Sequence, residues 1–174
     1  MTALPPRALF QHCPRCAKAL PAGSDPRMEC GHCGWVYYVN PTVSASVFAA
    51  REDGRVLLLR RSSEPAKGRW APPGGFIDFD ETAEAAAARE AREETALAID
   101  GLRFLGSWTN RYVYRGVEYR VLDLFFTARA LNPTDAAPSE EAEDVSWVLP
   151  RDADPESMAF PSTAAALRRL QEGQ

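Results

Sequence analysis

The sequence predicts an α/β sandwich preceded by a small unit that holds all of the cysteines. Strand-like runs flank a long Ala- and Glu-rich helical pattern at 82–95, and an amphipathic helical pattern follows near the end at 162–170. The four cysteines all lie within the first 33 residues. Together these observations favour one α/β core with a separate N-terminal appendage.

The elements follow in order along the chain. Turn residues 52–54 separate strand-like runs at 42–50 and 56–61, which predicts a hairpin. Thr82 is a suitable N-cap for the helix, because its side chain can accept a hydrogen bond from the first turn. The remaining expected elements are a loop at 62–73, strands at 102–108, 118–130 and 145–149, a further strand or turn at 112–116, a loop at 132–142 and a terminal helix at 162–170.

Composition and charge narrow the class of protein. The chain has 174 residues, 45% hydrophobic, which is enough for one core and a small appendage. A net charge of −4 argues against a general nucleic-acid binder. No stretch reaches the roughly 18 apolar residues that span a membrane, and Pro5 and Pro6 interrupt the N-terminus where a leader would lie. We therefore expect a cytoplasmic protein without a membrane partner.

The cysteines form two Cys-x-x-Cys pairs separated by 13 residues: Cys13, Cys16, Cys30 and Cys33. This spacing is typical of a zinc ribbon, here residues 1–36, in which each pair presents two thiolates to one tetrahedral ion. Because four thiolates leave no open position for water, we expect a structural zinc. Two disulfides are the alternative, and a cytoplasmic location disfavours them. His12 and His32 flank the cysteines and are alternative ligands.

The helical pattern at 82–95 carries a cluster of carboxylates. Glu90, Glu93 and Glu94 lie at i, i+3 and i+4, so they share one face of a helix. They would repel one another unless a hard cation such as Mg²⁺ were bound between them. A small-residue turn at 72–75 precedes the helix and would let the backbone approach a ligand closely. A solvated acidic helix face is the alternative for the three glutamates taken alone.

The longer pattern resembles the signature of the Nudix hydrolase family. The matching positions are Gly75, Glu81, Arg89, Glu90, Ala91, Glu93, Glu94 and Leu97. Ala96 departs from the pattern, since the family usually has glycine there. Glycine would permit a left-handed conformation where the helix ends, so alanine is expected to cost about 1 kcal/mol.

Over roughly residues 10–150 the chain is similar to Nudix enzymes with an N-terminal zinc ribbon. This resemblance implies a Nudix domain at 37–174, an α/β/α sandwich with a mixed sheet, and often a homodimer. Members of this group cleave the pyrophosphate bond of ADP-ribose, FAD or NADH. The segment that follows the signature in the NADH-cleaving branch is absent here, so NADH ranks below the other substrates. The segment 159–162 is similar to one common in the group.

The resemblance also implies roles for individual residues. Glu90 and Glu94 would hold Mg²⁺ or Mn²⁺, with Glu93 as a further ligand or as the base for water. The Gly75 carbonyl would be another ligand, and Glu81 and Arg89 would orient the glutamates. In some family members the base lies on a distant loop, where Glu141 is the candidate and Glu140 its rival.

Substrate contacts and alternative functions complete the expectations. Arg60, Arg61 and Arg111 are candidates for phosphate contacts, and Tyr112 for stacking on a base. Solvated cations and packed aromatics are the alternative for each. A nucleotide-metabolite sensor would have lost its carboxylates, and this chain retains them. A nucleic-acid or protein-binding ribbon is a further alternative, but residues 1–40 carry a surplus of only two cations.

Overall fold

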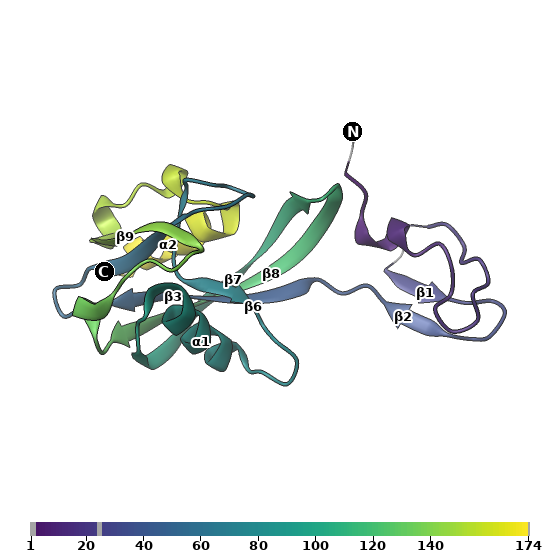
Figure 1. Ribbon diagram of the computed structural model, residues 1–174, viewed down its shortest axis with the longest axis horizontal. Helices are drawn as coiled ribbons and strands as arrows, with labels where there is room; N and C mark the ends of the chain where they lie inside the picture. The colour runs from purple at the N-terminus through teal and green to yellow at the C-terminus, as the bar shows by residue number, and fades with distance from the viewer. Residues whose placement is uncertain (1–2, 24–25, 174) are drawn as a thin grey trace. The chain divides into compact units, whose positions relative to one another are not determined.

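The computed structural model describes residues 3–23 and 26–173. The chain divides into two compact units (Figure 1). The larger unit comprises Val43–Asn110 and Val121–Gln174, and the smaller comprises Met1–Thr42 and Arg111–Arg120. The hairpin between 111 and 120 thus belongs to the same unit as the N-terminal segment.

A seven-stranded sheet forms the centre of the fold within the described residues. Five strands follow the order β5-β4-β3-β8-β7, while β6 pairs with β3 and β9 pairs with β4. The strands are β3 (Thr42–Ala50), β4 (Val56–Arg61), β5 (Trp70–Ala71), β6 (Gly74–Phe76), β7 (Ile99–Tyr114), β8 (Val117–Ala130) and β9 (Ala142–Val148). Strand β3 therefore lies between β4 and β8 and also receives β6.

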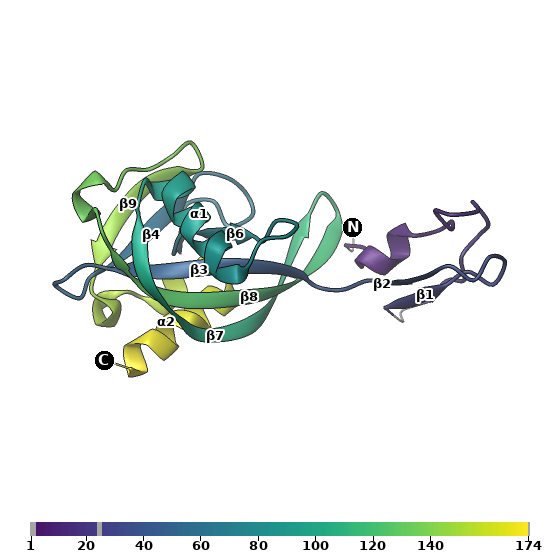
Figure 2. The ribbon, with the colours of Figure 1, turned by 90° about the horizontal axis from the view of Figure 1, so that it is seen from below.

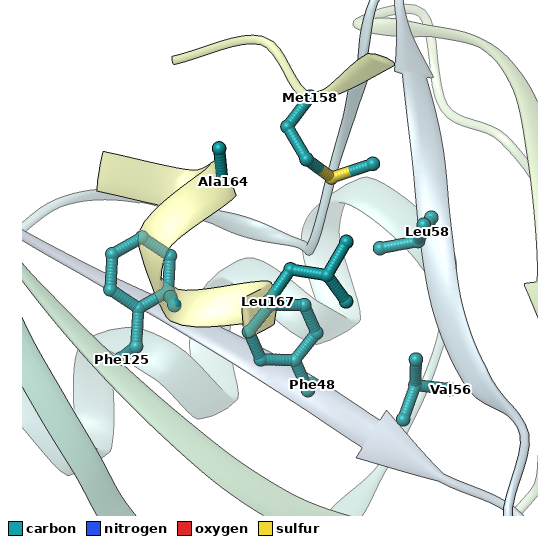
Figure 3. Packing of buried hydrophobic residues seen from close by; sticks show 8 residues of the cluster. Phe48, Val56, Leu58, Phe125, Met158, Ala164 and Leu167 are labelled. Atoms are coloured by element: carbon teal, nitrogen blue, oxygen red, sulfur yellow. The ribbon is translucent and has the colours of Figure 1, made fainter. Parts of the chain in front are cut away.

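Two helices cover opposite faces of this sheet (Figure 2). Helix α1 (Ala83–Thr95) lays three alanines on Ala45 and Val47 of β3: these are Ala86, Ala87 and Ala91, all fully buried. Helix α2 (Pro161–Glu172) adds Leu167 to a buried cluster with Phe48 and Phe125 on the other face (Figure 3). Small side chains thus bring α1 close to the sheet, while larger ones fill the α2 side.

A buried carboxylate joins the start of α2 to the sheet. Asp123 of β8 is 8% exposed and accepts hydrogen bonds from Ser44 Oγ (2.6 Å) and Ser162 Oγ (2.5 Å). Phe160, the N-cap residue of α2, provides no side-chain cap. The negative charge of Asp123 close to the first turn of α2 has the sign that favours a helix N-terminus.

The smaller unit contains the cysteines and two short strands. Strand β1 (Arg27–Glu29) pairs antiparallel with β2 (Val36–Tyr38). Leu4 is hydrogen-bonded to the tip of the hairpin through two backbone contacts, from Leu4 N to Gly116 O (2.9 Å) and from Glu118 N to Leu4 O (2.8 Å).

Short 3-10 helices occur in both units of the described chain. They are η1 (Pro6–Leu9), η2 (Pro133–Asp135), η3 (Pro150–Asp152) and η4 (Pro155–Ser157).

The structure confirms several predicted elements and corrects others. Strands β3 and β4 and the Thr82 cap of α1 lie as expected, with Ala85 N bonded to Thr82 Oγ1 (3.2 Å). The expected loop at 62–73 contains β5, and the small-residue turn at 72–75 runs into β6, because backbone pairing with β4 and β3 extends these residues. Strand β7 continues unbroken from 99 to 114 beside β8. No helix in the described part of the chain is long and apolar enough to cross a membrane.

Helix α1 ends at the residue where the family usually has glycine. Ala96 has φ 59° and ψ 11°, in the left-handed region. Its N–H donates to Arg92 O (2.9 Å), and Leu97 N donates to Ala91 O (3.2 Å), which satisfies carbonyls at the end of the helix. The geometry therefore requires the conformation that glycine adopts without strain.

We predict that Ala96→Gly stabilises the protein by up to about 1 kcal/mol, because glycine relieves the left-handed strain. In thermal unfolding this corresponds to a rise of roughly 2 to 4 °C. Ala98→Gly is the matched control, since no left-handed conformation is needed there. Equal or lower stability of Ala96→Gly would show that alanine is held in this turn without strain.

Candidate active and metal sites

The C-terminal half of α1 places its glutamates against the backbone of β6. Glu94 Oε2 accepts a hydrogen bond from Gly74 N at 2.8 Å. The Glu90 carboxylate lies so close to Gly75 that a Cβ at that position would collide with it. The absent side chain of Gly75 thus leaves room for the carboxylate, and a larger residue at this position would displace it.

Arg89 connects four oxygen-bearing groups around the same helix. Its Nε and Nη2 bind the two oxygens of Glu81, each at 3.0 Å. Its Nη1 binds Glu90 at 2.7 Å and Glu93 at 3.0 Å, and Nη2 also donates to Phe76 O at 3.1 Å. One guanidinium thus fixes three carboxylates and the end of β6 with charge-assisted hydrogen bonds.

The carboxylates differ in how easily they ionise. Burial is the main cause that raises the pKa of Glu94 to about 7. The hydrogen bond from Gly74 and the positive charge of Arg61 both oppose this rise. Burial also raises the pKa of Glu90, against the effect of Arg89. The Arg89 hydrogen bonds lower the pKa of Glu81. Glu90 raises the pKa of Glu94 by charge repulsion, so a cation beside them would be favourable.

The loop before β9 brings a further carboxylate toward this pair. The negative charge of Glu141 contributes to the raised pKa of both Glu90 and Glu94. The loop is held by bonds from Ser62 N to Glu141 O (3.1 Å) and from Ser62 Oγ to Glu140 O (3.1 Å). Of the two candidate loop glutamates, Glu141 is the one whose charge acts on the α1 carboxylates.

The expected substrate-contacting residues lie in different surroundings. Arg61 lies over the Phe160 ring (5.4 Å to the centroid), donates from Nε to Pro65 O (2.9 Å), and lowers the pKa of Glu94. Arg60 instead lies near Glu143 and Asp144, at 3.7 and 3.9 Å. Arg111 belongs to the smaller unit, and the Tyr112 side chain lies outside the described part of the chain.

The four cysteines gather at a second site. Cys13 Sγ and Cys33 Sγ are 3.7 Å apart, and Cys16 Sγ and Cys30 Sγ are 3.6 Å apart. A tetrahedral ion with Zn–S bonds of about 2.3 Å requires sulfurs about 3.8 Å apart, so the set fits zinc. Within residues 3–23 and 26–173, only these four side chains bring three or more His, Cys, Asp or Glu ligand atoms within 4.8 Å of one another.

The thiols are free and differ in acidity. Backbone hydrogen bonds from Cys33 and His32 lower the pKa of Cys30 to about 6. A backbone hydrogen bond from Lys18 favours the Cys16 thiolate, but burial and the neighbouring sulfurs outweigh it and raise the pKa of Cys16 to about 12. A cation bound between the four sulfurs would hold all of them as thiolates.

Comparison with known proteins identifies the family. The NUDIX domain model matches residues 40–170, so the chain belongs to the Nudix family. A NUDIX hydrolase from Nitrosomonas europaea has the same fold, with a TM-score of 0.72 over 94% of this chain and 92% of the other, at 24% identity. The mixed sheet between helices predicted from the sequence is thereby confirmed, and the cysteine cluster agrees with a small zinc ribbon.

Two relatives are similar to the chain around the signature. An ADP-ribose pyrophosphatase from Methanocaldococcus jannaschii is 37% identical over 73 residues, which are 42% of this chain and 43% of the relative. An NAD-capped RNA hydrolase NudC from Haemophilus influenzae is 36% identical over 83 residues, 46% of this chain and 31% of the relative. The chain spans less than two thirds of the length of the curated relatives that it matches.

Two features near the site were not predicted from the sequence. The Asp123 carboxylate joins Ser44 and Ser162, residues far apart in the chain, so no local pattern indicates it. Asn132 contacts the turn after α1 through its side chain. An asparagine followed by proline is typical of a turn, so this pattern does not indicate that the Asn132 side chain also bonds to the end of α1.

The raised pKa of Glu94 predicts a pH-dependent stability without Mg²⁺ or Mn²⁺. Between the ordinary value of 4.5 and about 7, the folded protein holds a proton that the unfolded chain releases. Stability therefore falls as the pH rises through this interval and is level above it. Glu94→Gln removes this contribution, so at pH 8 the variant should be more stable than the wild type by on the order of 2 kcal/mol.

Urea unfolding of both proteins at pH 5 and pH 8, without added divalent ions, measures this difference. At pH 5 the two stabilities should be closer than at pH 8. A difference that is the same at both pH values would mean that Glu94 ionises normally in the folded protein.

Proposed function

We propose that the protein is a metal-dependent hydrolase that cleaves the pyrophosphate bond of a nucleoside diphosphate linked to another group, such as ADP-ribose or FAD. The observation that carries this proposal is the grouping of Glu90 and Glu94 on the β6 backbone, with Arg89 bonded to Glu90 and Glu93, in a chain of the Nudix family. The similarity to an ADP-ribose pyrophosphatase supports the substrate class.

The α1 carboxylates offer oxygen ligands of the kind that a divalent ion such as Mg²⁺ or Mn²⁺ prefers. Glu90 and Glu94 would hold it, with the Gly75 carbonyl and Glu93 as further oxygen ligands. When bound, the ion would polarise the phosphate oxygens and lower the pKa of a water molecule. Arg89 and Glu81 orient the ligands, because Arg89 is bonded to Glu81, Glu90 and Glu93 at once.

The proposed reaction needs one group to take a proton from water. As the water oxygen forms a bond to phosphorus, the bond to the bridging oxygen breaks, and that oxygen leaves with the second phosphate. Glu141 is the first candidate for the base, because its charge acts on the Glu90 and Glu94 carboxylates. Glu93 is the second candidate, since it is on α1 and its side chain is 59% exposed.

Arg61 is the best supported of the candidate substrate contacts. It lies on Phe160, and its charge acts on Glu94, so it is placed to bind a phosphate beside the proposed metal. Phe76, 43% exposed at the end of β6, offers a face for a nucleobase. Arg60 has carboxylate neighbours of its own, and Arg111 and Tyr112 stay predictions.

The remaining assignments are also proposals. We assign structural zinc to the four cysteines, a ribbon to residues 1–36 and the hydrolase domain to 37–174. A homodimer, a cytoplasmic location and the absence of a nucleic-acid or membrane partner stay predictions. A non-catalytic nucleotide sensor is the alternative to the hydrolase, and the retention of Glu90, Glu93 and Glu94 favours the hydrolase.

We expect the purified protein with Mg²⁺ or Mn²⁺ to hydrolyse one class in a panel of ADP-ribose, FAD, NADH, diadenosine polyphosphates and nucleoside triphosphates. Products identified by mass should be AMP and a second phosphate ester. A Glu93→Gln, Glu94→Gln double variant should lower the rate about 1000-fold, because it removes ligands and a candidate base.

Glu84→Gln is the matched control, since Glu84 lies exposed in the first turn of α1. The single variants Glu93→Gln and Glu141→Gln distinguish the two candidate bases. Replacing the true base should remove the acidic limb of the pH–rate profile, where the rate rises as the base loses its proton. Tight binding of one compound without turnover would instead identify a sensor.

We also expect one zinc ion per chain after purification under reducing conditions, measured by elemental analysis. Cys30→Ser should lower the zinc content and the unfolding temperature, because it removes a ligand whose thiolate the backbone N–H groups favour. His32→Ala is the control and should keep its zinc. Loss of zinc from His32→Ala would identify a histidine ligand in place of one of the thiolates.

A further inference from the structure

Asn132 lies two residues after the end of β8, and its side-chain amide makes three hydrogen bonds. Its Oδ1 accepts from Ala98 N at 2.7 Å, and its Nδ2 donates to Ala96 O at 3.1 Å. The same Nδ2 donates to Asp135 Oδ2 at 3.1 Å. The amide thus bonds the backbone on both sides of Leu97, in the turn that ends the glutamate-bearing helix.

The backbone beside Asn132 contacts the same turn. Leu131 N donates to Ala98 O at 2.9 Å, so main chain and side chain together hold residues 96 to 98. Ala96 at the start of this turn has φ 59° and stands where the family signature has glycine. An alanine reverts more readily than glycine from the left-handed region unless its neighbours hold it there. The two hydrogen bonds from Asn132 supply such a restraint.

The chain continues from Asn132 into the loop that carries Glu141. Along this loop Ala137 N donates to Thr95 O (3.2 Å) and Ser139 N donates to Glu94 O (3.1 Å). Ser139 Oγ then accepts from Glu141 N (3.2 Å). The loop is therefore bonded to the last carbonyls of α1, and Asn132 and Asp135 lie where it begins.

We propose that Asn132 is a positioning residue that holds the end of α1 and the Glu141 loop as one unit, and that it stabilises the left-handed Ala96 in place of the signature glycine. Its side chain bonds to Ala96, Ala98 and Asp135, none of which is a proposed metal ligand. Its effect on catalysis rests on the proposed function, in which Glu94 and Glu141 must lie at a fixed separation. Its effect on the turn does not depend on any activity.

Amide hydrogen exchange tests the effect on the turn. Asn132→Ala should accelerate exchange at Ala96, Leu97 and Ser139 by about tenfold, with strand amides of β3 and β4 unchanged. Adding Ala96→Gly should restore protection at Leu97, because glycine keeps the left-handed conformation without the restraint. Thr134→Ala is the control, since its hydroxyl bonds Asp135 alone. Uniform acceleration across the sheet, or no rescue by glycine, would overturn the proposal for the turn.

A kinetic cycle tests the effect on Glu141. Asn132→Ala should lower kcat about tenfold with little change in KM. In the Glu141→Gln background the same change should have almost no further effect, because the group that Asn132 positions is already gone. If the double variant lost as much kcat as the product of the two single losses, Asn132 would not act through Glu141. A protein without any hydrolase activity would refute the proposed function and the kinetic role, while the exchange experiment would still decide the role in the turn.

Discussion

The close packing of α1 on the sheet is the constraint on which the site depends. Ala86, Ala87 and Ala91 are fully buried, so the helix contributes only methyl groups to its contact with β3. This close packing lets Glu94 reach the Gly74 N–H and lets Glu90 lie against Gly75. A larger side chain on this face would lift the helix and move both carboxylates away from β6, since packed interiors do not absorb extra volume.

The same packing brings negative charges close together, and the protein neutralises them only in part. Bringing Glu90 and Glu94 into a partly buried position raises the pKa of each, and Glu141 adds to the repulsion. Arg89 is the internal counter-ion, but its bonds reach Glu81, Glu90 and Glu93 and leave out Glu94. The remaining negative charge is thus concentrated beside the β6 backbone, where a divalent cation would be stabilised most.

The parts of the fold that local patterns determine were predictable from the sequence. The β3–β4 hairpin and the Thr82 cap depend on residues close together in the chain, and the spacing of the glutamates placed them on one face of α1. Strand β6 was expected as a turn, because two glycines disguise a segment that pairing with β3 extends. The Asp123 link and the bonds from Asn132 to the turn after α1 join residues at least 34 positions apart, which no local pattern reveals.

Strand β3 is connected to both parts of the proposed site, the glutamates of α1 and the segment before α2. On one side it receives β6, whose Gly75 lies against Glu90; on the other its Ser44 bonds Asp123, which also holds Ser162 at the start of α2. Phe160 and its partner Arg61 adjoin this start of α2. Glu94, which is bonded to Gly74 of β6, and Arg61, which lies over Phe160 at the start of α2, are therefore both linked to β3 through neighbouring elements. The two parts of the proposed site thus come from different elements, α1 and the segment before α2, and β3 is the strand to which both are connected.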